Sequence, residues 1–109
     1  MGTYKRMARE NILIIAHERG LNKTKGILKA LKNKNCILFI DQPPNDFKTY
    51  VNNARQIIIS PWFNIIDVIS KVKHIDIIYC CNENLLPIQS QLEYYYNIKN
   101  LSPFAAEVL

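Results

Sequence analysis

The chain has 109 residues, a length that supports one domain with a buried core. Its hydrophobic fraction of 49% and its three glycines exclude disordered, collagen-like and low-complexity proteins. Fourteen Lys and Arg against nine Asp and Glu give a formal net charge of +5. Much of the excess lies in two segments, residues 5–9 and 23–34.

The basic segment at residues 23–34 lacks the features of a specific nucleic-acid interface. Its lysines are interleaved with an apolar stripe at helical spacing, which is typical of the solvated side of one helix. No aromatic residue lies among them to stack a base, and no RNP, zinc-finger or helix-turn-helix pattern is present. We therefore expect no specific nucleic-acid partner; a weak, salt-sensitive attraction to DNA or RNA stays open.

The sequence indicates neither a membrane partner nor an oxidising compartment. Its apolar runs are far shorter than the ~20 residues that span a bilayer, and no secretory signal is recognisable. An odd number of cysteines, with an adjacent pair, is typical of reduced thiols that pack as small hydrophobes: Cys36, Cys80 and Cys81. We expect a cytoplasmic protein in which residues 1–10 form a flexible basic arm.

Strands are predicted at four short runs rich in isoleucine and leucine: residues 12–16, 36–40, 57–59 and 75–80. The first three are continuously apolar rather than alternating. This pattern indicates strands that are covered on both faces, as in a parallel sheet between helices.

Helix-period segments alternate with these strands. The first has Asn22 or Thr24 as possible N-cap; the second carries an apolar stripe of Ile65, Ile66, Ile69 and Val72, with Ser60 or Asn64 as cap. The third repeats apolar residues from Leu85 to Tyr95, with Pro87 in its first turn. Between the second and third strands we expect a loop and at most a short helix over residues 42–53. The predicted fold class is α/β, a Rossmann-like three-layer domain with a mostly parallel sheet of about four strands over residues 11–109.

Ligands of open parallel sheets bind beyond the carboxyl ends of the strands. In this chain those ends are polar, and the first of them carries Arg19 and Gly20 before a helix start, a combination that can hold an anion. Glu83 follows the fourth strand, where a ligand contact and a favourable interaction with a helix dipole are equally good interpretations. These three residues are the candidate substrate-binding residues.

No catalytic site is complete in this sequence. It contains no G-x-G-x-x-G fingerprint, no P-loop and no G-x-S-x-G elbow, and its histidines and cysteines have no metal-ligand spacing. His17 and Glu18 could form an acid–base pair, although adjacent loop residues need not face each other. Asp41 stands where a Rossmann enzyme places its ribose-binding acid, but it can equally start a turn. We therefore predict no catalytic residue and no metal ligand.

Two stretches resemble the N-terminal domain that precedes the ATP-grasp fold in biotin carboxylase, carbamoyl-phosphate synthetase and related carboxylate–amine ligases. Residues 11–16 with Arg19 and Gly20 look like that family's first strand and substrate-side loop. The second stretch matches its strand, glutamate, helix, short connection and further helix, in residues 76–79, Glu83, the helix to Tyr95, Asn97–Ile98 and Leu101–Pro103. The family's first loop is usually richer in glycine, and its ATP-binding lysine follows the last of these helices.

The resemblance implies the N-terminal, substrate-side domain of a ligase that activates a carboxylate with ATP and joins it to an amine. Arg19 would clamp a carboxylate substrate, and Glu83 would make a polar contact near the domain junction. ATP and Mg²⁺ would be cofactors of the full-length protein, bound by an ATP-grasp domain of the same chain and not by this piece. A helix opening at Ser102 and Pro103 fits a chain cut from a longer protein, and apolar surface exposed by the cut would allow a homodimer. The alternative is a stand-alone Rossmann-like binding or regulatory module.

Overall fold

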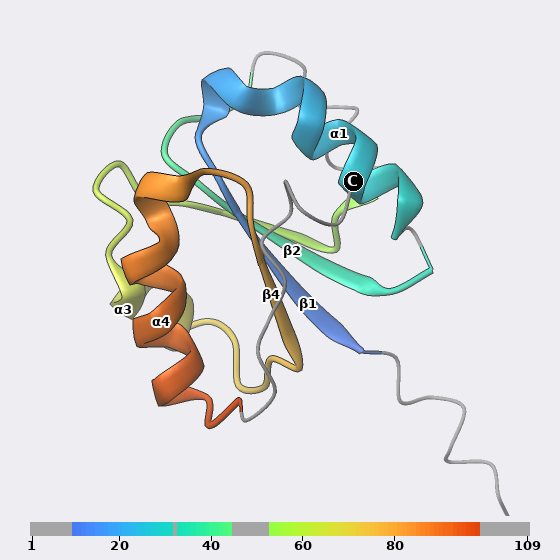
Figure 1. The fold of residues 1–109 in the computed structure, drawn as a ribbon. Helices are drawn as coiled ribbons and strands as arrows, with labels where there is room; N and C mark the ends of the chain where they lie inside the picture. Colours follow the sequence, from blue (N-terminus) through green and yellow to red (C-terminus); the bar gives the residue numbers. More distant parts are fainter. Residues whose placement is uncertain (1–9, 32, 45–52, 99–109) are drawn as a thin grey trace, which may run out of the picture.

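The computed structural model describes residues 10–31, 33–44 and 53–98 (Figure 1). The elements in chain order are β1 (Asn11–Ala16), the 3₁₀ turn η2 (Glu18–Gly20), α1 (Leu21–Ala30), β2 (Asn35–Ile40), β3 (Gln56–Ile59), α3 (Ile65–Ile69), β4 (Ile77–Cys80), the 3₁₀ turn η3 (Glu83–Leu85) and α4 (Leu86–Tyr95). The predicted basic arm, most of the second crossover and the helix opening at Ser102 lie outside the described residues.

The four strands form one sheet in the order β3-β2-β1-β4, and all three pairings are parallel. The predicted α/β class and the predicted strands are therefore confirmed, and the arrangement is compatible with a Rossmann-like three-layer domain. The sequence did not predict the strand order. The observed order places β4 directly beside β1. The segments that follow these two strands therefore meet at the carboxyl edge, at the point where the strand order reverses direction.

Both faces of the sheet are covered, as the continuous apolar runs predicted. In β1, Ile12 and Ile14 face one core while Leu13 and Ile15 face the other, and all four are at most 1% exposed. Figure 1 shows α1 on one side of the sheet and α3 with α4 on the other. Because the strand interior has no solvated face, polar side chains can gather only at the strand ends.

Helix α1 begins at Leu21, before both of its predicted N-cap residues, Asn22 and Thr24. Turn η2 runs directly into α1 at Leu21, so Asn22 and Thr24 lie inside the helix and neither is its N-cap. Thr24 is fully buried, and its hydroxyl points to the Cys81 thiol at 3.9 Å. Burial of the apolar stripe therefore decided where this helix lies, over the local capping preference.

Asn64 is confirmed as the N-cap of the short helix α3. Its side-chain oxygen accepts a hydrogen bond from the backbone N–H of Ile66. The predicted stripe is only partly correct. Ile66 is 63% exposed, whereas Val68 and Val72 enter the core. Since α3 ends at Ile69, its single full turn cannot bury the whole stripe.

Helix α4 carries Pro87 in its first turn, as predicted. Its predicted last core residue, Tyr95, is more than half exposed; the next residue, Tyr96, packs on the core and donates its hydroxyl to the carbonyl of Val72 at 2.6 Å. The helix ends in a Schellman motif, with Ile98 N–H bonded to the Glu93 carbonyl and Asn97 N–H to the Tyr94 carbonyl.

In the parts of the chain that the structure describes, no helix is long and apolar enough to cross a membrane. Cys36, Cys80 and Cys81 are free thiols and are buried, as expected of small core residues. Burial raises the pKa of Cys80 to about 11, so this thiol is not a nucleophile at neutral pH.

The Schellman motif supplies a stability prediction at Asn97, which is exposed and has a φ of 56°. Asn97→Ala is expected to lower the free energy of unfolding by about 1 kcal/mol, because alanine tolerates the left-handed region less well than asparagine. Asn97→Gly is expected to leave it unchanged or raise it slightly. Urea denaturation measures both variants, and equal stabilities for the two would contradict the motif.

Candidate functional site

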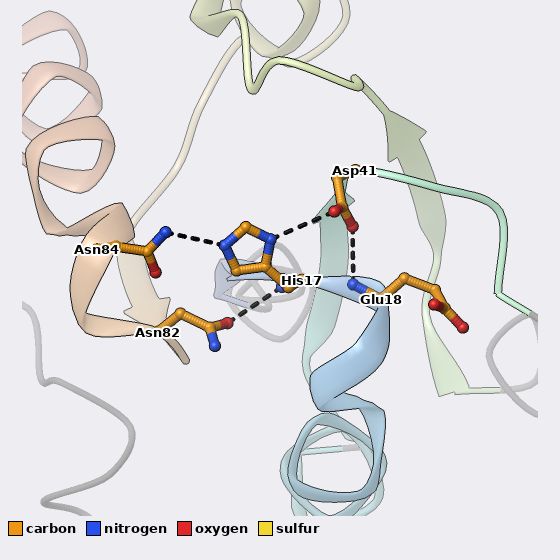
Figure 2. A network of polar contacts seen from close by, with 5 residues as sticks. All are labelled: His17, Glu18, Asp41, Asn82 and Asn84. Atoms are coloured by element: carbon orange, nitrogen blue, oxygen red, sulfur yellow. Dashed lines mark hydrogen bonds and ion pairs between the residues drawn. The ribbon is translucent and has the colours of Figure 1, made fainter.

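Polar side chains from three strands converge at the carboxyl edge of the sheet, around His17 (Figure 2). His17 directly follows β1, Asp41 directly follows β2, and Asn82 and Asn84 lie just beyond β4. The parallel order of these strands brings together residues that are up to 67 positions apart in the sequence.

His17 is held by three hydrogen bonds. Its ring Nδ1 lies 3.2 Å from Oδ2 of Asp41, and its Nε2 lies 3.1 Å from Nδ2 of Asn84. Its backbone N–H donates to Oδ1 of Asn82 at 3.1 Å. Figure 2 shows the imidazole lying between Asp41 and Asn84, so one ring spans the ends of β2 and β4.

The two partners of the ring indicate which ring nitrogen donates and which accepts. An ionised Asp41 carboxylate can only accept, so Nδ1 carries the proton; the Asn84 amide nitrogen can only donate, so Nε2 is the acceptor. The arrangement therefore fits a ring that donates from Nδ1 to Asp41. Both ring nitrogens are engaged within the protein.

Asp41 accepts a second hydrogen bond, from the backbone N–H of Glu18 at 2.7 Å. Partial burial pushes its pKa upward, but the hydrogen bonds from the Glu18 N–H, the His17 ring and its own backbone N–H outweigh that effect. The pKa of Asp41 consequently lies below its ordinary value of 3.8. The carboxylate thus stays ionised at neutral pH and fixes the start of turn η2.

An aromatic contact supports His17 from a third direction. The ring of Phe63 meets the imidazole edge to face at a centroid distance of 5.2 Å, and it meets Phe39 in the same way at 5.4 Å. Phe63 is buried and has a φ of 51°, which is uncommon for a bulky side chain. Such strained residues persist where the surroundings determine them, and they gather at functional sites.

The segment that holds Phe63 is fixed by Ser60, which follows β3. The Ser60 hydroxyl donates to Oδ2 of Asp67 at 2.6 Å and accepts from the Asn64 backbone N–H at 2.9 Å. Ser60 is buried and fully used by these contacts. Ser60 therefore stabilises the loop that carries Phe63 and the neighbouring Trp62.

The three predicted binding residues lie at this edge. Arg19 is in turn η2, Gly20 is the last residue of that turn, and Glu83 opens η3 between the two asparagines that hold His17. Arg19 and Glu83 are exposed, and neither forms an ion pair with any residue that the structure describes. The network places both charges beside one rigid cluster, but it does not join them to each other.

The predicted alternatives for His17 and Asp41 are now resolved in part. The partner of His17 is Asp41, not the adjacent Glu18, whose side chain takes no part in the contact. Sequence reasoning missed Asn82 and Asn84 because their role depends on β4 lying next to β1. The only signal in the sequence was their position after a predicted strand.

The arrangement can orient and bind, but it does not form a catalytic set. The His17–Asp41 pair resembles the base of a hydrolase, yet Ser60 is committed to Asp67 and no described hydroxyl or thiol approaches the imidazole. Among the described residues, no group of three or more His, Cys, Asp or Glu side chains could hold a metal ion. The described edge is a polar platform, a cluster of side chains joined by hydrogen bonds around His17.

Comparison with known proteins finds no matching family model, no similar curated protein and no similar solved structure. The basis for assigning a function is therefore the residues and their geometry.

The Asp41 contacts predict a pH-dependent effect on stability. Asp41→Asn is expected to lower the free energy of unfolding by about 1–2 kcal/mol at neutral pH, since a charge-assisted acceptor is lost. Because the pKa of Asp41 is lowered in the folded protein, its stabilisation is present above 3.8 and disappears as the pH falls through the folded pKa.

Urea denaturation from neutral to acidic pH measures the effect, with the exposed Glu83→Gln as the control carboxylate. The two stability curves of Asp41→Asn and the unaltered chain are expected to converge at acidic pH. A constant difference at every pH would mean that Asp41 acts by packing and not by charge.

Proposed function

We propose that this chain is the substrate-side domain of a cytoplasmic ATP-grasp ligase, which activates a carboxylate and joins it to an amine. The observation that carries the proposal is the polar platform at the carboxyl edge, with an exposed cation and an exposed anion on it, Arg19 and Glu83. The resemblance of residues 11–20 and 76–103 to the domain that precedes the ATP-grasp fold supports the same conclusion.

Arg19 suits the recognition of a carboxylate substrate. A guanidinium presents two parallel N–H donors that match the two oxygens of a carboxylate, and it remains charged at every physiological pH. The backbone of Arg19 lies in η2, and the Asp41 carboxylate holds the first N–H group of that turn. The binding group thus projects from a fixed backbone, which lowers the entropy lost when a ligand binds.

Glu83 has a complementary role beside the same cluster. Its neighbours on both sides, Asn82 and Asn84, are hydrogen-bonded to His17, so the backbone that presents its carboxylate is fixed as well. An exposed carboxylate can accept hydrogen bonds from a donor on the ligand or on a facing domain. In this proposal Glu83 makes the polar contact at the junction with the ATP-grasp domain.

ATP and Mg²⁺ would be held by that second domain, where the nucleotide converts the substrate carboxylate into an acyl phosphate that an amine can attack. The described residues of this chain provide the wall of the site: they bind and orient the acid. This division agrees with a chain in which the carboxyl edge has charged and amide groups but no complete catalytic set.

The test of the proposal is ATP hydrolysis by the full translated product of the gene. Phosphate release is measured with Mg²⁺, ATP and panels of carboxylic acids and amines. We expect release that requires both an acid and an amine. A product without such activity, or a reading frame that stops at Leu109, would refute the ligase and leave the stand-alone binding module.

Variants of Arg19 test its role in the active ligase. Arg19→Ala is expected to reduce kcat/KM for the acid by about tenfold to a hundredfold, the loss of a charge-assisted contact, while the KM for ATP stays unchanged. Arg19→Lys keeps the charge without the paired donors and should restore activity only partly. Lys29→Ala, which removes an exposed lysine of α1, is the matched control. Unchanged kinetics for the acid would remove Arg19 from the site.

A further inference from the structure

The opposite, amino edge of the sheet has a groove of its own, with a volume of about 320 Å³. Its cationic walls are Arg55, next to the start of β3, and Lys71 and Lys73, in the segment between α3 and β4. Two nearly buried side chains, Ile37 and Val72, lie at its apolar base. The volume is at the lower end of the range of small-molecule sites.

Three cations meet at this groove. In the described ranges, no carboxylate forms an ion pair with Arg55, Lys71 or Lys73. A nearby lysine behaves differently: Lys34, just before β2, is 3.0 Å from a carboxylate oxygen of Glu10. Among the described residues, the amino edge therefore has one ion-paired lysine and three cations that share a concave surface, where like charges favour a bound anion.

One acid beside the groove, Asp76, is engaged by two of the lining residues. Asp76 accepts from the His74 ring Nε2 at 2.6 Å and from the backbone N–H of Asn11 at 2.8 Å. Both His74 and Asn11 line the groove, and Asn11 also bonds the His74 carbonyl and the Asn35 side chain. These contacts fix the wall beside the cations, and the Asp76 carboxylate forms no ion pair with Arg55, Lys71 or Lys73.

Interaction with a helix dipole does not account for the cluster. Cations are favoured within the last turn of a helix, but α3 has only five residues and ends at Ile69, before Lys71 and Lys73. Arg55 belongs to a different segment, just before β3. Its backbone N–H donates to the carbonyl of Cys36 in β2. Two segments separated in the sequence therefore bring cations to one groove.

We propose that this groove binds the phosphate group of a small organic molecule whose apolar part covers Ile37 and Val72. Three cations match the charge of a phosphate dianion better than that of a single carboxylate, and a guanidinium pairs with two phosphate oxygens at once. The site is separate from the platform around His17, since it lies at the other end of the strands. It can therefore hold a regulatory or second ligand whether or not the ligase assignment is correct.

The chemistry of the groove favours a small molecule over a nucleic acid. None of the described residues that line it is Phe, Tyr or Trp, so these residues offer no ring on which a base can stack. Of the exposed aromatic residues that the structure describes, Trp62 follows β3 at the carboxyl edge, and Tyr94 and Tyr95 end α4 without lining the groove.

The test uses phenyl phosphate and inorganic phosphate as probes, at constant ionic strength, against the isotopically labelled chain. We expect saturable amide shifts at residues 55–56 and 71–74, with His17 and Asn84 unaffected. Phenyl phosphate should bind more tightly than inorganic phosphate because its ring covers the apolar base. Absence of a saturable shift with phenyl phosphate, or equal affinity for the two probes, overturns the proposal.

Charge variants separate a site from general attraction. Arg55→Gln combined with Lys73→Gln is expected to weaken phenyl phosphate binding by about tenfold per cation removed, with no loss of fold because like charges are being removed. Lys29→Gln lowers the net charge equally but lies on α1 and is expected to have no effect. Equal weakening by Lys29→Gln contradicts a defined site. Tighter binding of a short single-stranded RNA at the same residues assigns the groove to a nucleic-acid backbone instead.

Discussion

The double-sided burial of β1 is the constraint on which the rest of this structure depends. Residues Ile12 to Ala16 are essentially inaccessible to water, with alternate side chains in two different cores. A strand of this kind can present polar groups only where it begins and where it ends. The molecule consequently has two chemically distinct edges, a mixed polar platform at the carboxyl ends of the strands and a cationic groove at their amino ends.

At the carboxyl edge, the polar groups are held together by His17. A single imidazole connects the ends of β2 and β4 through Asp41 and Asn84, and Phe63 contacts it from the loop after β3. All four strand ends therefore meet around one side chain. Each contact limits the freedom of the next, so the loops that carry Arg19 and Glu83 are held in place before any ligand arrives.

The strands and the fold class could be predicted because they follow from one local property, a continuous run of apolar residues. Asn64 and Pro87 could be predicted for a similar reason, since capping chemistry acts over a few residues. Ile66 and Tyr95 could not, because periodicity assigns a helix face without saying where that helix ends. The His17 network was beyond reach for a third reason: it exists only because β4 pairs with β1, and strand order is set by packing of the whole domain.

If the proposed function is correct, a carboxylate ligand binds at the carboxyl edge and not in the cationic groove. The most direct measurement is an amide chemical-shift map of the isotopically labelled chain, titrated with a panel of carboxylic acids. Trp62, the single tryptophan, is 90% exposed beside the platform and gives an independent fluorescence signal. We expect saturable shifts at Arg19 and Asn82–Asn84 together with a fluorescence change. Shifts confined to Arg55, Lys71 and Lys73 would contradict it.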